Sequence, residues 1–138
     1  LDVYNLLIQS TNSQHGLAAN NRKFFWNSLE NYFEPINYDS NPNIDLNNPT
    51  TTTASYRLPI SENYFSAFED LREKLKNTDK KNIQNNINYS GVEMSYDLVS
   101  KKIERIIHNL NKIEKVYNNI INRCLGHLLI GYLYEFYC

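Results

Sequence analysis

The hydrophobic pattern is strongest in the C-terminal third of the chain, where apolar or aromatic side chains recur at alternating steps of four and three. The series is Val99, Ile103, Ile106, Leu110, Ile113, Tyr117, Ile120 and Cys124. An α-helix turns once in about 3.6 residues, so these steps return to one side of a helix, and a strict seven-residue repeat is typical of a coiled coil or helical bundle. The pattern predicts a long helix over 95–125 with a coiled-coil-like heptad seam formed by these side chains.

Local signals agree with a long C-terminal helix. Ser95 is a candidate N-cap, and Asp97 places negative charge in the first turn, where the helix dipole favours it. No glycine or proline interrupts 92–125. A helix of about 30 residues would be about 45 Å long, which exceeds a typical globular helix.

Three further segments carry helical spacing. The first is 1–9, the second is an aromatic segment over 21–34 that Pro35 ends, and the third is 61–77 with a candidate N-cap at Ser61. The apolar stripe of the third segment is Tyr64, Phe68, Leu71 and Leu75. The sequence therefore predicts a single all-α domain over 1–138, a helical bundle of three to four helices.

Two polar stretches separate these segments. The stretch 35–58 is rich in Asn, Asp, Pro and Thr and is predicted to be a long irregular loop or flexible tether. Isolated apolar residues within it are able to pin it to a surface, and these are Ile36, Tyr38, Ile44, Leu46 and Tyr56. The stretch 78–94 contains Ile83 and Ile87 four residues apart, and we interpret it as a connector in preference to a weak helix.

Composition and charge narrow the function classes. The 138 residues include 14 basic and 15 acidic side chains, a balance that argues against nucleic acid or an anionic membrane as the main partner. The two cysteines form no disulfide framework, and we interpret them as reduced thiols of an intracellular protein, nuclear or cytoplasmic. The last apolar run, 125–137, is too short to span a membrane, since spanning needs about 20 residues.

Candidate chemistry is sparse. The histidines lie on different segments, and none has a second ligand at metal-binding spacing. Cys124 and His127 are three residues apart and share a helix face, but this spacing in an apolar helix is more typical of packing than of a nucleophile and its base. Acidic side chains over 69–73 alternate with basic ones, as on a solvated helix face. We therefore expect no enzyme activity, no cofactor and no metal.

The remaining feature is apolar surface in excess of what the chain can cover. The aromatic segment places Trp26 among Phe24, Phe25, Tyr32 and Phe33, a cluster typical of docking surfaces, although most of these rings fit a core equally well. The long helix is predicted to outrun its partners within the chain. The predicted partner-binding residues are Phe24, Trp26, Leu110, Ile113, Tyr117, Ile120, Leu128 and Tyr132.

The sequence favours a non-catalytic protein–protein interaction module, a subunit or scaffold that docks on another helical protein or self-associates through its C-terminal helix. One alternative is a nucleic-acid-binding helical domain that uses a Lys/Arg patch at 74–81 and 101–105. A second alternative is a secreted recognition domain of a parasite or virus, in which the two cysteines are oxidised. The high Asn content is attributed to an A+T-rich genome.

Overall fold

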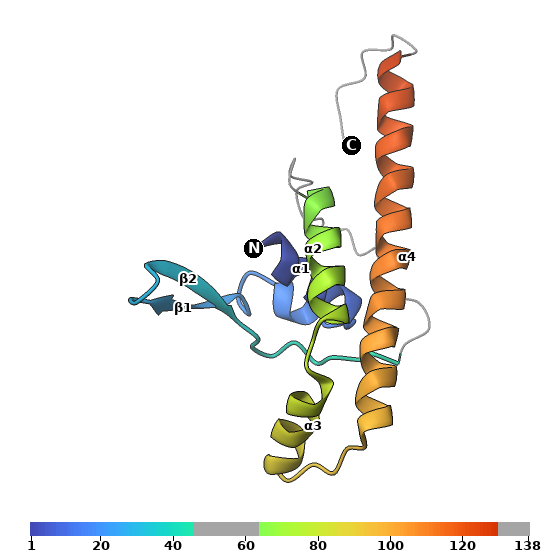
Figure 1. The fold of residues 1–138 in the computed structure, drawn as a ribbon. Helices are drawn as coiled ribbons and strands as arrows, with labels where there is room; N and C mark the ends of the chain where they lie inside the picture. The colour runs from blue at the N-terminus through green and yellow to red at the C-terminus, as the bar shows by residue number, and fades with distance from the viewer. Residues whose placement is uncertain (46–63, 130–138) are drawn as a thin grey trace.

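The protein is described by a computed structural model that covers residues 1–45 and 64–129, with side chains as far as Asn122. The elements in chain order are α1 (Asp2–Ser10), the 3-10 helix η1 (Gln14–Leu17), β1 (Lys23–Asn27), β2 (Tyr32–Ile36), α2 (Tyr64–Lys76), α3 (Lys80–Tyr89) and α4 (Tyr96–Leu129). Helices α1 and α2 pack on each other and on α4, and α3 packs on the first turns of α4 (Figure 1). The described chain is mostly helical, with a small two-stranded antiparallel sheet.

Helix α4 begins as the sequence predicts. The Ser95 hydroxyl accepts a hydrogen bond from the Leu98 amide at 3.2 Å, which is the N-cap interaction. The seam faces inward over its first half and meets the stripe of α2 and one side of α1. The core consists of Leu6, Tyr64, Ala67, Phe68, Leu71, Leu75, Val99, Ile103, Ile106, Leu110 and Ile113.

One buried polar contact ties α1 to α4. The Asn109 side chain is fully buried, and its Nδ2 donates to the carbonyl of Ser10 at 2.9 Å. That carbonyl lies in the last turn of α1, where the helix supplies no partner for it. The contact therefore fixes the end of α1 against α4 within an otherwise apolar core.

The prediction of a helix over 21–34 is wrong, because this segment forms the β1–β2 hairpin. Phe25, Leu29 and Tyr32 fit helical spacing, but the run Phe24–Phe25–Trp26 also has high strand propensity. The turn residues favour the hairpin over the helix. Asn31 has a φ of 58°, a left-handed conformation that Asn tolerates, and this reverses the chain.

The prediction of a connector over 78–94 is also wrong, because α3 lies within it. Asp79 is its N-cap, and its Oδ1 accepts from the amides of Lys81 and Asn82 at 3.0 Å each. Ile83 and Ile87 pack against the core from one face of α3. The cap and this pair of apolar contacts compensate for the modest helix propensity of its asparagines.

The predicted loop over 35–58 is corrected in part. Residues 35 and 36 belong to β2, and the irregular segment 37–45 is held on the helices. The Asn43 amide donates to the Thr11 carbonyl at 3.0 Å, Ile44 packs against the core, and Asp45 pairs with Lys102 of α4. The remainder of the predicted loop, from residue 46, lies outside the described residues, as does Ser61.

Candidate interaction surface

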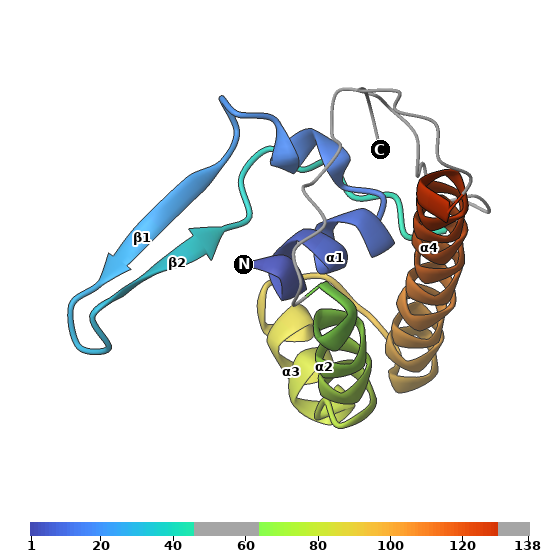
Figure 2. The same ribbon diagram turned by 90° about the horizontal axis from the view of Figure 1, so that it is seen from above.

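The hairpin projects from the helical body (Figures 1 and 2). It carries large apolar side chains that remain exposed. Its strands and their flanks contribute Phe24, Phe25, Trp26, Leu29, Tyr32, Phe33, Ile36 and Tyr38. The exposed fractions of Phe24 and Trp26 are 44% and 45%, and that of Leu29 at the tip is 94%. Isolated exposed apolar residues are common on proteins, whereas a contiguous exposed apolar set is unusual and makes the hairpin a candidate interaction surface.

One face of the hairpin is apolar throughout. Successive residues of a strand point to opposite faces, and cross-strand partners share a face. The register pairs Phe24 with Pro35 and Trp26 with Phe33, so these four side chains lie together. The rings of Trp26 and Phe33 are 4.9 Å apart between centroids and tilted by 57°. We call this set the aromatic face.

The opposite face is mixed. Asn27 Nδ2 donates to Glu34 Oε1 at 2.5 Å, and the Lys23 ammonium lies 5.6 Å from the centroid of the Tyr38 ring. A hydrogen bond with Glu34 and the negative charge of that carboxylate raise the pKa of the Tyr32 phenol. This face supplies polar groups alongside Phe25 and Ile36.

The turn between the strands is stabilised by one side chain. Asn27 Oδ1 accepts from the amides of Leu29 at 3.0 Å and Glu30 at 3.2 Å, which satisfies backbone donors at the tip. Such side-chain-to-backbone contacts are a main reason why Asn is frequent in turns. The turn presents Leu29 outward at the end of the hairpin.

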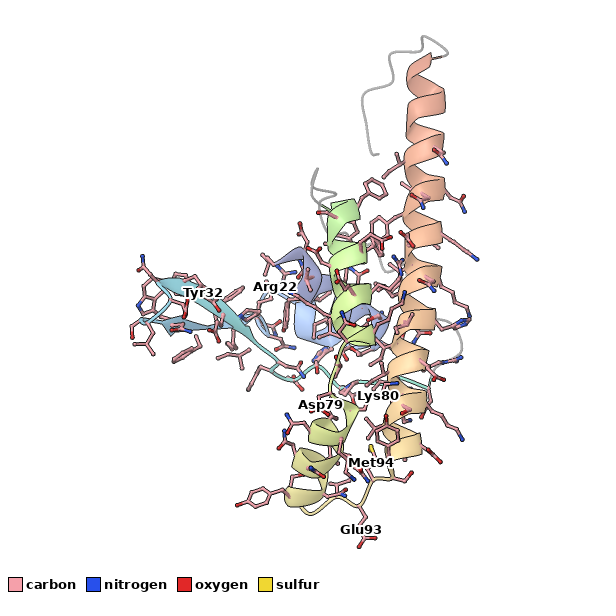
Figure 3. The ribbon with its side chains drawn as sticks, viewed as in Figure 1. Arg22, Tyr32, Asp79, Lys80, Glu93 and Met94 are labelled. Atoms are coloured by element: carbon pink, nitrogen blue, oxygen red, sulfur yellow. The ribbon has the colours of Figure 1, made fainter. Side chains whose placement is uncertain are left out.

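The base of the hairpin is fastened to α1 and η1. Arg22 donates through Nε to the Leu17 carbonyl and through Nη2 to Asn5 Oδ1, each at 3.1 Å. On the returning strand, the Tyr4 hydroxyl donates to the Ile36 carbonyl at 3.2 Å. Figure 3 shows Arg22 beside the helices and Tyr32 out on the projecting hairpin. The aromatic face is thus presented from an anchored base.

A glycine contact reinforces that base. A Cβ placed on Gly16 would lie 2.8 Å from the Cβ of Ser40, so η1 approaches the segment after β2 more closely than a side chain allows. Next to this contact, His15 Nε2 lies 3.1 Å from Asp39 Oδ2, and Asn21 Nδ2 donates to the His15 carbonyl at 3.0 Å. The chain entering β1 and the chain leaving β2 are therefore held side by side.

The other predicted partner-binding residues divide into four groups. Leu110 and Ile113 are fully buried in the core, so they are inaccessible to a partner in this fold. Tyr117 is half-buried, with its ring 4.8 Å from that of Tyr64 between centroids. Ile120, three residues after Tyr117 on α4, is 41% exposed. The side chain of Leu128 and all of Tyr132 lie outside the described residues.

Within 1–45 and 64–122 no group of three or more His, Asp or Glu side chains is placed to hold a metal ion. The most strongly perturbed phenol, Tyr64, has a raised pKa because it is buried in the core, where no substrate reaches it. A depression on the surface is lined by Glu69, Arg72, Glu73, Lys76 and Asn77, all from α2 or its end. Its charges are paired in part, since Arg72 bridges Glu69 and Glu114.

The basic groups proposed for nucleic acid lie on different elements. Lys74 and Lys76 end α2, Lys80 and Lys81 begin α3, and the 101–105 group is on α4. Two members of the α4 group are engaged with the chain itself, because Lys102 pairs with the Asp45 carboxylate and Arg105 donates to the Asp45 carbonyl at 3.3 Å. These contacts reduce the positive charge available to a phosphate backbone.

The aromatic face was only partly visible in the sequence. The sequence indicates Phe24, Trp26 and Phe33 as part of a docking candidate, but it assigns the fourth member of the face, Pro35, to the end of a helix and the start of a loop. The signal that identifies the hairpin is the pair of asparagines, Asn27 and Asn31, around a short polar tip between two aromatic runs. Helical spacing within the same segment obscured it.

The fold and this surface define a mostly helical domain with a projecting aromatic hairpin. Comparison of the chain with protein-family models, with curated proteins and with solved structures finds no match. In the part of the chain that the structure describes, no helix is both long and apolar enough to cross a membrane.

Proposed function

We propose that this chain is a non-catalytic interaction module that docks on another protein, either a helical partner or a second copy of itself. The observation that carries the proposal is the aromatic face of Phe24, Trp26, Phe33 and Pro35 on a hairpin that is anchored at its base and exposed along its length. Burial of apolar surface contributes about 25 cal/mol per Å², and Trp and Tyr dominate binding hot spots.

Anchoring supports this role because it lowers the cost of binding. A flexible segment loses conformational entropy when it is captured, whereas a hairpin already fixed by Arg22, Tyr4 and the Asn27 turn loses less. Its ring pair, Trp26 on Phe33, is likewise ordered before a partner arrives. The hairpin therefore has the properties of a preformed docking element.

The part of α4 that follows Tyr117 is the second part of the proposed surface. The seam is covered by the chain as far as Ile113 and Tyr117, and Ile120 continues it into solvent. We propose that a partner helix, or the same helix of a second copy, completes a coiled-coil-like contact from Tyr117 onward. Nuclear or cytoplasmic location remains a prediction that accompanies this role.

A photochemical crosslink tests the proposal. The photoreactive residue p-benzoylphenylalanine replaces Trp26 in the full chain, which is then irradiated in its native cells, and adducts are identified by mass spectrometry. Tyr89 provides the matched control, because it is an aromatic residue on α3 with a 95% exposed side chain. We expect a discrete adduct from position 26 and none from position 89.

Equal labelling at both positions, or no adduct from position 26, would contradict the proposal. A crosslink to nucleic acid from the Lys/Arg patch, with none from the hairpin, would favour the alternative of a nucleic-acid-binding domain.

A further inference from the structure

We propose that the occupant of the hairpin is a second copy of this chain, which adds its own β1 antiparallel to β1 and makes one continuous four-stranded sheet. The inference rests on the proposed interaction role and specifies its partner. Among the described residues, β1 has β2 as its one neighbouring strand, so its other edge presents backbone N–H and C=O groups that a further strand can pair.

The two edges of the hairpin are not equivalent. Pro35 lies in β2 and has no N–H to donate, so the edge of β2 is interrupted for strand addition. β1 has no proline. Figure 2 shows β2 on the side nearer the helices and β1 on the far side, where its outer edge faces away from the body. Only the β1 edge combines an uninterrupted backbone with room for another molecule.

The position of Pro35 also indicates which groups of β1 point outward. Hydrogen-bonded and non-hydrogen-bonded pairs alternate along an antiparallel ladder. Phe24 pairs with Pro35, and a residue without N–H fits the non-hydrogen-bonded position. Trp26, two residues on, then has the same orientation. The backbone groups of Phe24 and Trp26 are thus the ones directed to the free edge.

These outward groups are self-complementary about Phe25. We place the twofold axis of the dimer at Phe25. Phe24 of each copy then lies opposite Trp26 of the other copy, and each of these two pairs exchanges two backbone hydrogen bonds. Phe25 faces its own counterpart at the non-hydrogen-bonded position, where side chains are closest. Aromatic residues therefore lie opposite aromatic residues at all three central positions, which is a favourable cross-strand pairing.

Charge favours the same arrangement. Arg22 and Lys23 lie at the start of β1, and Glu30 lies in the tip beyond its end. Antiparallel pairing brings the basic start of one strand toward the acidic tip of the other and sets Lys23 opposite Asn27, so no like charges face each other. With a formal net charge of −1, two copies have little overall repulsion.

A charge-swap experiment tests the pairing. The full chain, Phe25→Lys and Phe25→Glu are compared by sedimentation equilibrium, each alone and then the two variants mixed. Phe25 is exposed in the single chain, so the fold tolerates either substitution, which far-UV circular dichroism verifies. We expect the wild type to be a dimer, each variant alone to dissociate with a dissociation constant raised by about tenfold or more, and the mixture to form a heterodimer.

Tyr32→Lys is the matched control, because it places the same charge on the same face of the hairpin as Phe25 but on β2, the outer strand of the proposed sheet, and outside the aromatic face. This variant stays dimeric if β1 is the paired edge. A monomeric wild type, loss of the dimer in Tyr32→Lys but not in Phe25→Lys, or failure of the mixture to associate would overturn the pairing. A monomer whose position 26 still crosslinks to a different protein overturns this inference alone, whereas a monomer without any crosslink overturns the interaction role as well.

Discussion

The seam of α4 and the β-hairpin are both rich in large apolar side chains, yet the first is covered by the chain as far as Tyr117 and the second is exposed on both faces. The seam presents one apolar stripe, which the stripe of α2 and one side of α1 can cover together. The hairpin presents apolar side chains on both faces, and a projecting two-stranded ribbon cannot cover either face by itself. Burial therefore does not follow from the number of apolar residues in a segment. It depends on their periodicity and on whether other elements of the chain can pack against them.

The largest expected effect is the removal of a seam side chain. Leu110→Ala deletes a fully buried side chain and leaves a cavity among α1, α2 and α4, so we expect the free energy of unfolding to fall by about 2–5 kcal/mol in urea titration. Leu29→Ala makes the same chemical change at the hairpin tip, where the side chain is 94% exposed, and is expected to alter stability by less than about 0.5 kcal/mol. Similar losses at the two positions would contradict the assigned environments.

These two regions also differ in how far the sequence predicted them. Helix α4, its Ser95 cap and the buried stripes of α2 and α4 were predicted because helical periodicity persists over many turns there. In the short segment 21–34 the same spacing had few repeats, and the turn conformation of Asn31 outweighed it. Helix α3 was missed since its propensity is low and its stability comes from the Asp79 cap and from Ile83 and Ile87 packing on α4.

The candidate surface was harder to predict than the fold for a related reason. Heptad spacing cannot distinguish a residue buried by its own chain from one buried by a partner, and Leu110 and Ile113 prove to be the former. Phe24 and Trp26 are exposed, and their common face depends on the strand register, which brings in Phe33 and Pro35. A register of this kind follows from the turn geometry, which the sequence pattern specifies weakly.

A smaller effect on stability is expected from the ionisation of Tyr64, whose ring packs against Tyr117 where the covered part of the seam ends. Burial raises the pKa of the Tyr64 phenol above its ordinary value of 10.0. Ionisation therefore favours the unfolded chain, so the contribution of Tyr64 is fully present below about pH 10 and declines as the pH rises further. Tyr64→Phe removes the hydroxyl and keeps the buried ring, so it is expected to change stability at neutral pH by less than about 1 kcal/mol.

Urea titrations of the wild type and Tyr64→Phe at pH 7 and at about pH 11 measure this effect. The wild type should lose more stability between the two pH values than the variant, because only the wild type has the Tyr64 phenol to ionise. The other tyrosines titrate in both proteins, so their contribution cancels in the comparison. A difference between the two proteins that does not change with pH would show that Tyr64 does not titrate in this way.

The smallest effect on global stability is expected from the hairpin turn. Asn27→Ala removes the acceptor of the Leu29 and Glu30 amides and the contact with Glu34, so the hairpin should open at lower urea concentration. The helical core makes none of these contacts, and its unfolding should change by less than about 0.5 kcal/mol. Trp26 is the single tryptophan, so its fluorescence follows the hairpin while circular dichroism at 222 nm follows the helices. In the variant, the fluorescence midpoint should fall while the helical midpoint stays in place. Coincident midpoints that move together would mean that the hairpin and the seam unfold as one unit, and the contrast between them would then apply to exposure alone and not to stability.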